Sequence, residues 1–308
     1  MDTASSSSVA PTLVSSLPGL QSFLSSIPPS GTCTLCLDLE GRNLSRNGTL
    51  ALLAILIHPS RVTYIIDVQT LGDSAFVTPG TGAGGQTLKA ILEDPHTPKY
   101  VWDIRNDADA LWAHYKVRPA GVIDVQLLEN ASRVGDKTYL HGLSKCVETD
   151  LRLKFMERHR WVKTKKEVQA LMPNDIFARR PLDAKTLEYC VNDVIYLPAL
   201  HDLYAERITS EWLAKAMEES AARVVEACGP AYQPQSDKKK LGPWGSGLGK
   251  NVVSIEEWIE KWEEEQMDAM FEHNGHYDDN WSDDLHDDVR GSRDVVWDDT
   301  FDSCWDKY

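Results

Sequence analysis

The chain has 308 residues, 42% of them hydrophobic and 26% charged, which is enough to bury one large or two modest cores, and its six cysteines are too sparse for a disulfide scaffold. Its formal net charge of −15 argues against a nucleic-acid partner only until that charge is located. Residues 251–308 carry 19 acidic and 4 basic side chains, so the remaining chain is neutral and the acidity belongs to a C-terminal tail.

Four segments are predicted along the chain. Residues 1–30 are rich in Ser and Pro and predict a loosely attached arm with a short helix after Gly19. Residues 31–228 predict the folded domain, 229–250 a linker, and 251–308 the acidic tail. No apolar run approaches the roughly 20 residues of a membrane-spanning helix, and no secretory signal or mitochondrial presequence is recognisable. We therefore expect a cytoplasmic or nuclear protein that is not secreted.

Periodicity predicts a mixed sheet with helices on its faces. Three apolar segments with short turns between them predict an antiparallel meander, over 33–40, 50–57 and 62–68. Strands and helices then alternate, which predicts parallel crossovers: helix 88–92, strand 100–104, helix 107–115 and strand 122–125. Further helices are predicted over 139–147, 183–208 and 211–227. Pro198 should kink the second of these, because proline cannot donate to the carbonyl of Val194.

Two carboxylates share one face of the first predicted strand. Asp38 and Glu40 are two residues apart, so both side chains project together while Leu37 and Leu39 pack on the opposite face. Adjacent carboxylates repel unless a cation lies between them, and Mg²⁺ prefers such oxygen ligands. An ordinary solvated strand edge is the alternative, but the apolar strand favours a central position for this pair.

Two further acidic positions follow later in the chain. Tyr189 and Asp193 are four residues apart on a predicted helix, which places the phenol and the carboxylate on one helix face. Asp107 falls at the start of a helix that follows a strand, where Asp103 and Asp109 compete with it for any functional role. Each feature alone is compatible with an ordinary surface or capping residue.

The order of these features resembles motifs I, II and III of the ribonuclease D-like 3′–5′ exonuclease superfamily. The resemblance covers roughly residues 31–208 and is supported by 122–126 (VIDVQ) and by 180–182 (RPL) before the third motif. A sister group has histidine five residues before the last aspartate. Glu188 stands there, so the chain resembles the tyrosine branch with four metal-binding acids (DEDDy). The implied fold is ribonuclease H-like, α/β, with a mixed five-stranded sheet flanked by helices. The composition of residues 251–308 adds an acidic, largely unstructured C-terminal tail.

The resemblance implies a site and a mechanism. It assigns metal binding to Asp38, Glu40, Asp107 and Asp193, and a water-orienting role to Tyr189. Two divalent ions, Mg²⁺ or Mn²⁺, would support phosphodiester hydrolysis from the 3′ end with release of 5′-monophosphates. Asp38 would bridge the ions, and Asp107 would reach one of them partly through water. Asp109→Ala should retain most activity, whereas Asp107→Ala should not.

A basic stretch supplies the expected nucleic-acid contact. Residues 152–166 contain seven basic side chains and one acidic one, which fits a single-strand backbone track with an aromatic stacking platform. A solvated helix face fits equally well. The candidate contacts are Arg158, Arg160, Trp161, Lys163, Lys165 and Lys166. The sequence does not distinguish RNA from DNA, because a metal site contacts phosphate.

The tail has features of its own. Ser254 and Glu257 form a capping box that begins an amphipathic helix over about 254–272, and Asp-rich sequence with scattered Trp follows. We hypothesise that residues 273–308 compete with substrate at the basic stretch or bind a basic protein partner. The alternative to the enzyme is a catalytically silent nucleic-acid-binding scaffold that acts through this tail.

Overall fold

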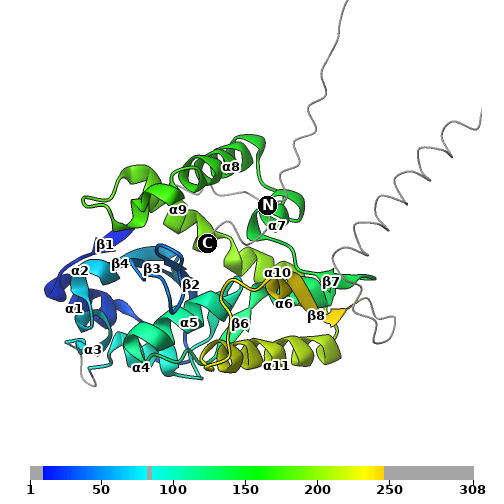
Figure 1. Cartoon of the computed structure of the whole chain (residues 1–308), viewed down its shortest axis with the longest axis horizontal. Coiled ribbons are helices and arrows are strands. Elements are labelled where there is room, and N and C mark those ends of the chain that lie inside the picture. The colour runs from blue at the N-terminus through cyan, green and yellow to red at the C-terminus, as the bar shows by residue number, and fades with distance from the viewer. Residues whose placement is uncertain (1–9, 82–84, 246–308) are drawn as a thin grey trace, which may run out of the picture.

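The computed structural model describes residues 10–81 and 85–245, and its centre is a six-stranded mixed sheet (Figure 1). The strand order is β1-β4-β3-β2-β5-β6. The strands are β1 (Thr12–Val14), β2 (Thr34–Glu40), β3 (Leu52–His58), β4 (Val62–Asp67), β5 (Lys99–Val101) and β6 (Val122–Asp124). β2, β3 and β4 form the predicted antiparallel meander, and β5 and β6 extend it in parallel beside β2. The predicted α/β fold with a mixed sheet is thus confirmed, with one strand more than predicted.

The additional strand comes from the N-terminal arm. β1 pairs in parallel with β4, and α1 (Leu17–Ser26) follows it with Leu20 and Phe23 buried. Pro18 does not interrupt the helix, because it lies in the first turn, where its missing N–H has no intrahelical partner. The expectation of a loosely attached arm is therefore wrong for residues 12–26.

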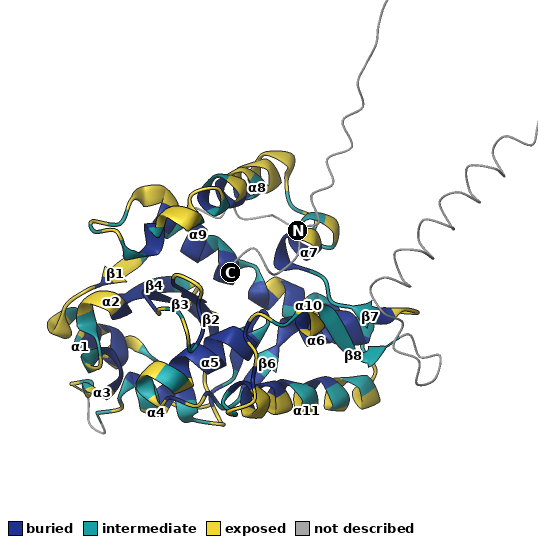
Figure 2. Cartoon of the chain, in the orientation of Figure 1, coloured by how far each residue is buried: buried dark blue, intermediate teal, exposed yellow. Residues whose placement is uncertain are grey.

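Helices cover both faces of the sheet. α8 and α9 lie on one side, and α1, α3, α4 and α11 lie on the other, while α5 is buried over most of its length (Figures 1 and 2). The helices are α2 (Val68–Leu71), α3 (Ser74–Val77), α4 (Leu88–Glu93), α5 (Ile104–Tyr115), α6 (Val125–Ser132), α7 (Leu143–Thr149), α8 (Phe155–Gln169), α9 (Ala184–Ile195), α10 (Leu197–Arg207) and α11 (Ser210–Ala227). Within the described ranges, none of these helices combines the length and apolarity needed to cross a membrane.

The alternation of β2 separates its two faces as predicted. Leu35, Leu37 and Leu39 belong to one hydrophobic cluster, together with Leu53 and Ile55 of the neighbouring strand β3. Cys36 points to the other face and belongs to a second cluster that includes residues of α9. Because Asp38 and Glu40 share the parity of Cys36, their carboxylates lie on the side of the sheet that α9 covers.

The long helix predicted over 183–208 is broken where proline requires it. α9 ends at Ile195, α10 begins at Leu197, and Pro198 lies in the first turn of α10. The kink is therefore confirmed. The helix predicted over 139–147 is partly wrong, since residues 137–139 form strand β7 and α7 begins only at Leu143.

Part of the predicted linker is integrated into the fold. A 3₁₀ turn over Asp237–Lys240 leads into β8 (Leu241–Gly245), which pairs antiparallel with β7 (Lys137–Tyr139). Gly242 is required there, because a Cβ atom would lie 2.1 Å from the carbonyl oxygen of Lys137. Residues 229–245 are thus not a free linker. The acidic tail, with its predicted helix over 254–272, lies outside the described residues.

Candidate active site

Three acidic side chains converge on the face of β2 that α9 covers. Asp38, Glu40 and Asp193 are each only 2% exposed. One potential ligand oxygen from each lies within 4.8 Å of the other two. Like charges at this spacing raise the free energy of the folded state unless a cation offsets them. The structure therefore brings together the strand pair and the last acid of the helical motif, and their role as metal ligands stays a prediction.

Local capping and an ion pair hold α9 against the strand. Asp183 caps the helix by accepting hydrogen bonds from the backbone N–H groups of Lys185 and Thr186, each at 2.9 Å. Just before it, the Arg180 guanidinium donates two 2.6 Å hydrogen bonds to the carboxylate of Asp67 at the end of β4. This ion pair anchors the entry to α9 on the sheet, and it gives a physical role to the arginine of the RPL segment.

Tyr189 lies one helical turn before Asp193 and is completely buried. Burial, and then the charges of Asp193, Glu40 and Asp38, raise the pKa of the Tyr189 phenol well above its usual value. The phenol is therefore protonated at neutral pH and offers a hydroxyl as hydrogen-bond donor and acceptor. It does not offer a phenolate base.

α5 places the competing aspartates in different environments. Asp103 caps the helix and pairs with Arg105 at 2.6 Å. Burial alone would raise the pKa of Asp103, but this ion pair lowers the pKa below its usual value. Asp109 is fully buried and pairs with Arg46 at 2.6 Å. Both carboxylates are thus bound by arginines, which argues against a metal-binding role for either of them.

Asp107 is 3% exposed and lies in the first turn of α5. It is not among the three acids whose ligand atoms lie within 4.8 Å. The helix that carries it, α5, starts just beyond the end of β5, the parallel neighbour of β2. A more distant fourth ligand agrees with contact to an ion partly through water, which stays a prediction.

The start of α5 is fixed by Asp124, from the segment 122–126 quoted above, and by two basic residues that come later in the chain. The carboxylate of Asp124 accepts hydrogen bonds from the backbone N–H groups of Asp103 and Ile104, at 3.0 and 3.2 Å. Arg223 of α11 donates to the same carboxylate at 2.7 Å, and Lys239 donates to Asn106 at 2.6 Å. Segments beyond residue 208 therefore brace the helix that carries Asp107.

We expect Asp109→Ala to lower the free energy of unfolding by about 2–4 kcal/mol, since it removes the buried counter-charge of Arg46, whose side chain is 23% exposed. Urea denaturation would measure this. The double variant Arg46→Met/Asp109→Ala should recover part of the loss. The cleavage rate per folded molecule should stay close to wild type, as the sequence predicts. A single variant as stable as wild type would show that the pair contributes nothing.

α8 presents only part of the predicted nucleic-acid surface. Arg158, Arg160, Lys163 and Lys166 are exposed. Trp161 is only 2% exposed and donates from Nε1 to the backbone oxygen of Asn192 at 3.2 Å. The side chain of Lys165 is 10% exposed and faces Asp193. Trp161 as a stacking platform and Lys165 as part of an outer backbone track are therefore wrong, because helical spacing turns both toward α9.

The aromatic ring that α8 does expose is Phe155. It is 69% exposed at the start of the helix and stacks on His159, with ring centroids 6.1 Å apart and planes 14° from parallel. Phe155 was not among the predicted contacts, although it lies within the basic stretch 152–166. An exposed aromatic ring beside exposed arginines is the combination from which single-strand contacts are built.

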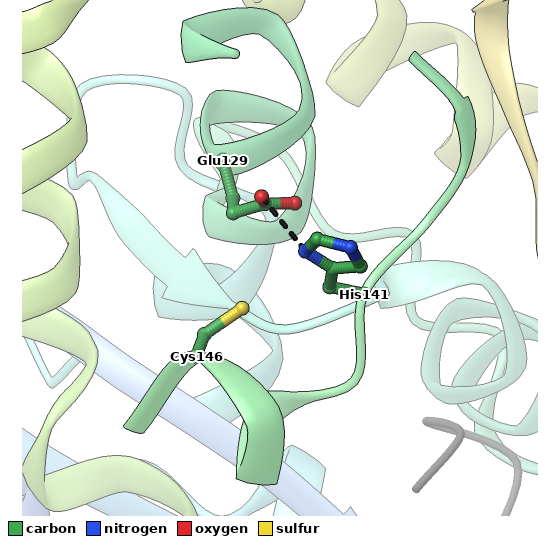
Figure 3. A group of neighbouring side chains, drawn as sticks. All are labelled: Glu129, His141 and Cys146. Atoms are coloured by element: carbon green, nitrogen blue, oxygen red, sulfur yellow. Dashed lines mark hydrogen bonds and ion pairs between the residues drawn. The ribbon is translucent and has the colours of Figure 1, made fainter. Parts of the chain in front are cut away.

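A second group of potential metal ligands has different chemistry (Figure 3). Glu129 of α6 accepts a 3.1 Å hydrogen bond from His141, and Arg133 pairs with both oxygens of the same carboxylate. Burial alone would raise the pKa of Glu129, but these contacts lower the pKa below its usual value. Burial raises the pKa of the Cys146 thiol well above its usual value. An acid already neutralised by arginine and a protonated thiol do not favour a cation.

The donor set of Asp38, Glu40 and Asp193 does fit divalent ions. It consists of carboxylate oxygens, which hard cations such as Mg²⁺ and Mn²⁺ prefer, and burial keeps the repelling charges from water. Among the described residues, two groups have metal-ligand geometry, and they differ in net charge. One holds three acids beside a lysine, and the other is offset by an arginine.

Comparison with known proteins agrees with this geometry. Residues 18–208 match the model of a protein family described as 3′-5′ exonuclease. Among curated proteins, none is a significant sequence match.

Several solved structures share the fold. RNase D of Trypanosoma brucei in complex with GMP is 20% identical, with a TM-score of 0.58 over 71% of this chain and 65% of that one. The structure of the same enzyme with RNA U12 is also 20% identical in sequence, with a TM-score of 0.55 over 70% of each chain. Escherichia coli RNase D, an exoribonuclease involved in structured RNA processing, is 20% identical in sequence. Its TM-score is 0.53 over 72% of this chain and 51% of that one. The chain thus spans about two thirds or half of these proteins.

Proposed function

Because the chain belongs to the 3′-5′ exonuclease family, we propose that it removes nucleotides from the 3′ end of single-stranded RNA and releases 5′-monophosphates. The observation that carries this proposal is the buried convergence of Asp38, Glu40 and Asp193 beside Tyr189. RNA is favoured over DNA because a structural neighbour was solved with RNA bound.

The side chains divide the work between them. Asp38, Glu40 and Asp193 would hold two divalent ions, and Asp107 would reach one of them from the start of α5. When bound, such a pair supplies an activated water and stabilises the attacking and leaving oxygens at phosphorus. The buried, protonated hydroxyl of Tyr189 then orients the attacking water by donating or accepting a hydrogen bond. Positioning, rather than proton removal, is its contribution.

The route to the site lies along α8. The four exposed basic residues of this helix attract the phosphate backbone. Phe155 offers a face on which a base can stack. These contacts carry no base-specific hydrogen bonds, so the preference that we expect is for single strands rather than for a sequence.

One experiment tests the function directly. Matched RNA and DNA single strands, each labelled at the 5′ end, are incubated with the full chain in Mg²⁺, Mn²⁺ or EDTA. The expected result is stepwise shortening of RNA from the 3′ end, release of 5′-monophosphates, and no cleavage in EDTA. A blocked 3′ end should protect the strand. Binding without cleavage in either ion would favour the silent scaffold, and EDTA-resistant cleavage would contradict the metal site.

The α8 surface should show separable charge and stacking contributions. Replacing Arg158, Arg160, Lys163 and Lys166 together by Gln should weaken RNA binding and flatten its salt dependence by about 0.7 in log–log slope for each phosphate that is no longer neutralised. Phe155→Ala should weaken binding by about 1–2 kcal/mol with the slope unchanged. Fluorescence titrations at several salt concentrations measure both. Met156→Ala, at the exposed neighbour that carries no ring, is the control and should bind RNA as wild type does. An effect of Phe155→Ala that disappears at high salt would contradict stacking.

A further inference from the structure

A buried lysine points into the carboxylate cluster. Nζ of Lys165 lies 3.3 Å from Oδ1 of Asp193, whose side chain is 0% exposed. Lys165 comes from α8 and Asp193 from α9, so the contact is tertiary. It brings a positive charge to an acid that the proposed function assigns to a divalent ion.

The lysine is held in place by its surroundings. Its ammonium lies 5.3 Å from the ring centroid of Trp161 and 5.8 Å from that of Tyr189, and aromatic faces attract cations at such distances. Trp161 is itself fixed by its hydrogen bond to the backbone of Asn192, the residue before Asp193. Residues 161, 164, 165 and 168 form the buried stripe of α8. The stripe therefore docks an otherwise polar helix with its lysine at the acids.

The charges determine what this lysine can do. Without ions, the ammonium of Lys165 offsets part of the repulsion among the three buried carboxylates. With ions, the same ammonium and a divalent cation share the carboxylate of Asp193 and repel each other. Lys165 is thus favourable in the first situation and unfavourable in the second, so its effect on the apo protein and on metal binding must differ in sign.

We propose that Lys165 is a tethered cation that supports the acid cluster in the metal-free protein and competes with a divalent ion at Asp193. The inference rests on the proposed metal site. Lys165 acts through Asp193 and is thus a positioning residue. It holds this acid ready for an ion and keeps metal binding weaker than the three carboxylates alone would make it.

The test is metal binding by the full-length chain. Lys165→Met keeps an apolar stem of similar length between the two rings and removes the charge. Calorimetric titration should show Mn²⁺ binding tightened by about 10- to 100-fold, the effect of one neighbouring charge at this distance. The thermal midpoint should fall in EDTA, and the rise on adding Mn²⁺ should exceed that of wild type. Lys165→Arg should restore values close to wild type.

The sign of the change distinguishes this role from simple packing. Damage to the helix contact would loosen the acids and weaken Mn²⁺ binding, whereas removal of a competing charge tightens it. Lys166→Met, a neighbouring variant on the exposed face of α8, should leave the Mn²⁺ affinity unchanged. Unchanged or weaker Mn²⁺ binding by Lys165→Met would overturn the proposal. So would an equal tightening by Lys166→Met, which would indicate a general charge effect.

These measurements do not depend on cleavage. A protein that shows the expected pattern of Mn²⁺ binding but cuts neither RNA nor DNA would overturn the proposed function and leave the role of Lys165 intact. A protein that cuts RNA with no change in metal affinity on Lys165→Met would do the reverse.

Discussion

Asp38→Asn is expected to abolish cleavage and metal binding together. Asp38 is 2% exposed and belongs to the cluster of three acids, and the proposed function would make it a ligand of the divalent ions. The amide preserves the shape of the side chain but removes one of the three negative charges that make the site attractive to cations. Excess Mn²⁺ should therefore not restore the rate. Calorimetry and the end-labelled RNA assay measure the two losses on the same protein.

The matched control is Glu129→Gln, the same change in a buried acid of the second candidate group. Because Arg133 already neutralises Glu129, we expect the number of bound Mn²⁺ ions to stay as in wild type. Circular dichroism shows whether each variant is folded. If Glu129→Gln lost an ion while Asp38→Asn kept all of them, the metal centre would have been assigned to the wrong group of side chains.

Tyr189→Phe should reduce the cleavage rate by about 10²–10³-fold, which corresponds to roughly 3–4 kcal/mol in the activation barrier. The ring stays between its neighbours, so the helix and the acids keep their places, and only the hydroxyl that orients the water is removed. Mn²⁺ affinity and RNA binding should remain close to wild type. Single-turnover kinetics with saturating enzyme would isolate the chemical step.

Tyr204→Phe provides the comparison for this variant. Tyr204 is also buried, at 1% exposure, but its hydroxyl donates to Asp150 at 2.6 Å, away from the three acids. Its removal should leave the single-turnover rate close to wild type, whatever it does to stability. Equal rates for Tyr189→Phe and wild type would exclude a role for the phenol in the reaction. Equal losses for both variants would show a packing effect.

Chain geometry by itself determined much of the site. The period of two along β2 puts Asp38 and Glu40 on one face, and the helical spacing puts Tyr189 one turn before Asp193. Neither relation needs any knowledge of neighbouring elements. The meander and the parallel crossovers also follow from local periodicity and short connections, and the kink before Pro198 follows from the chemistry of proline.

Only the tertiary structure showed which candidate side chains form ion pairs or pack against another helix. The local pattern does not separate Asp103 and Asp109 from Asp107; only the family resemblance selects Asp107, and the structure adds that Arg105 and Arg46 pair with the other two. Trp161 and Lys165 look like surface residues in a basic stretch until α8 docks on α9. Each of these outcomes depends on contacts between elements that are distant in the chain or on different helix faces, and no local pattern encodes such contacts.

The C-terminal part of the domain is a second case in which the sequence did not predict a contact between elements. The sequence predicts a late helix at α11. It predicts a linker over 229–245, because Pro, Gly and Lys are typical of exposed connections. In the fold, Arg223 and Lys239 supply the buried charges that the start of α5 requires. A buried ion pair is stable only when both partners arrive in the same place. The sequence therefore determined which residues carry charge, and the packing of α11 and the 3₁₀ turn against α5 determined where those charges are used.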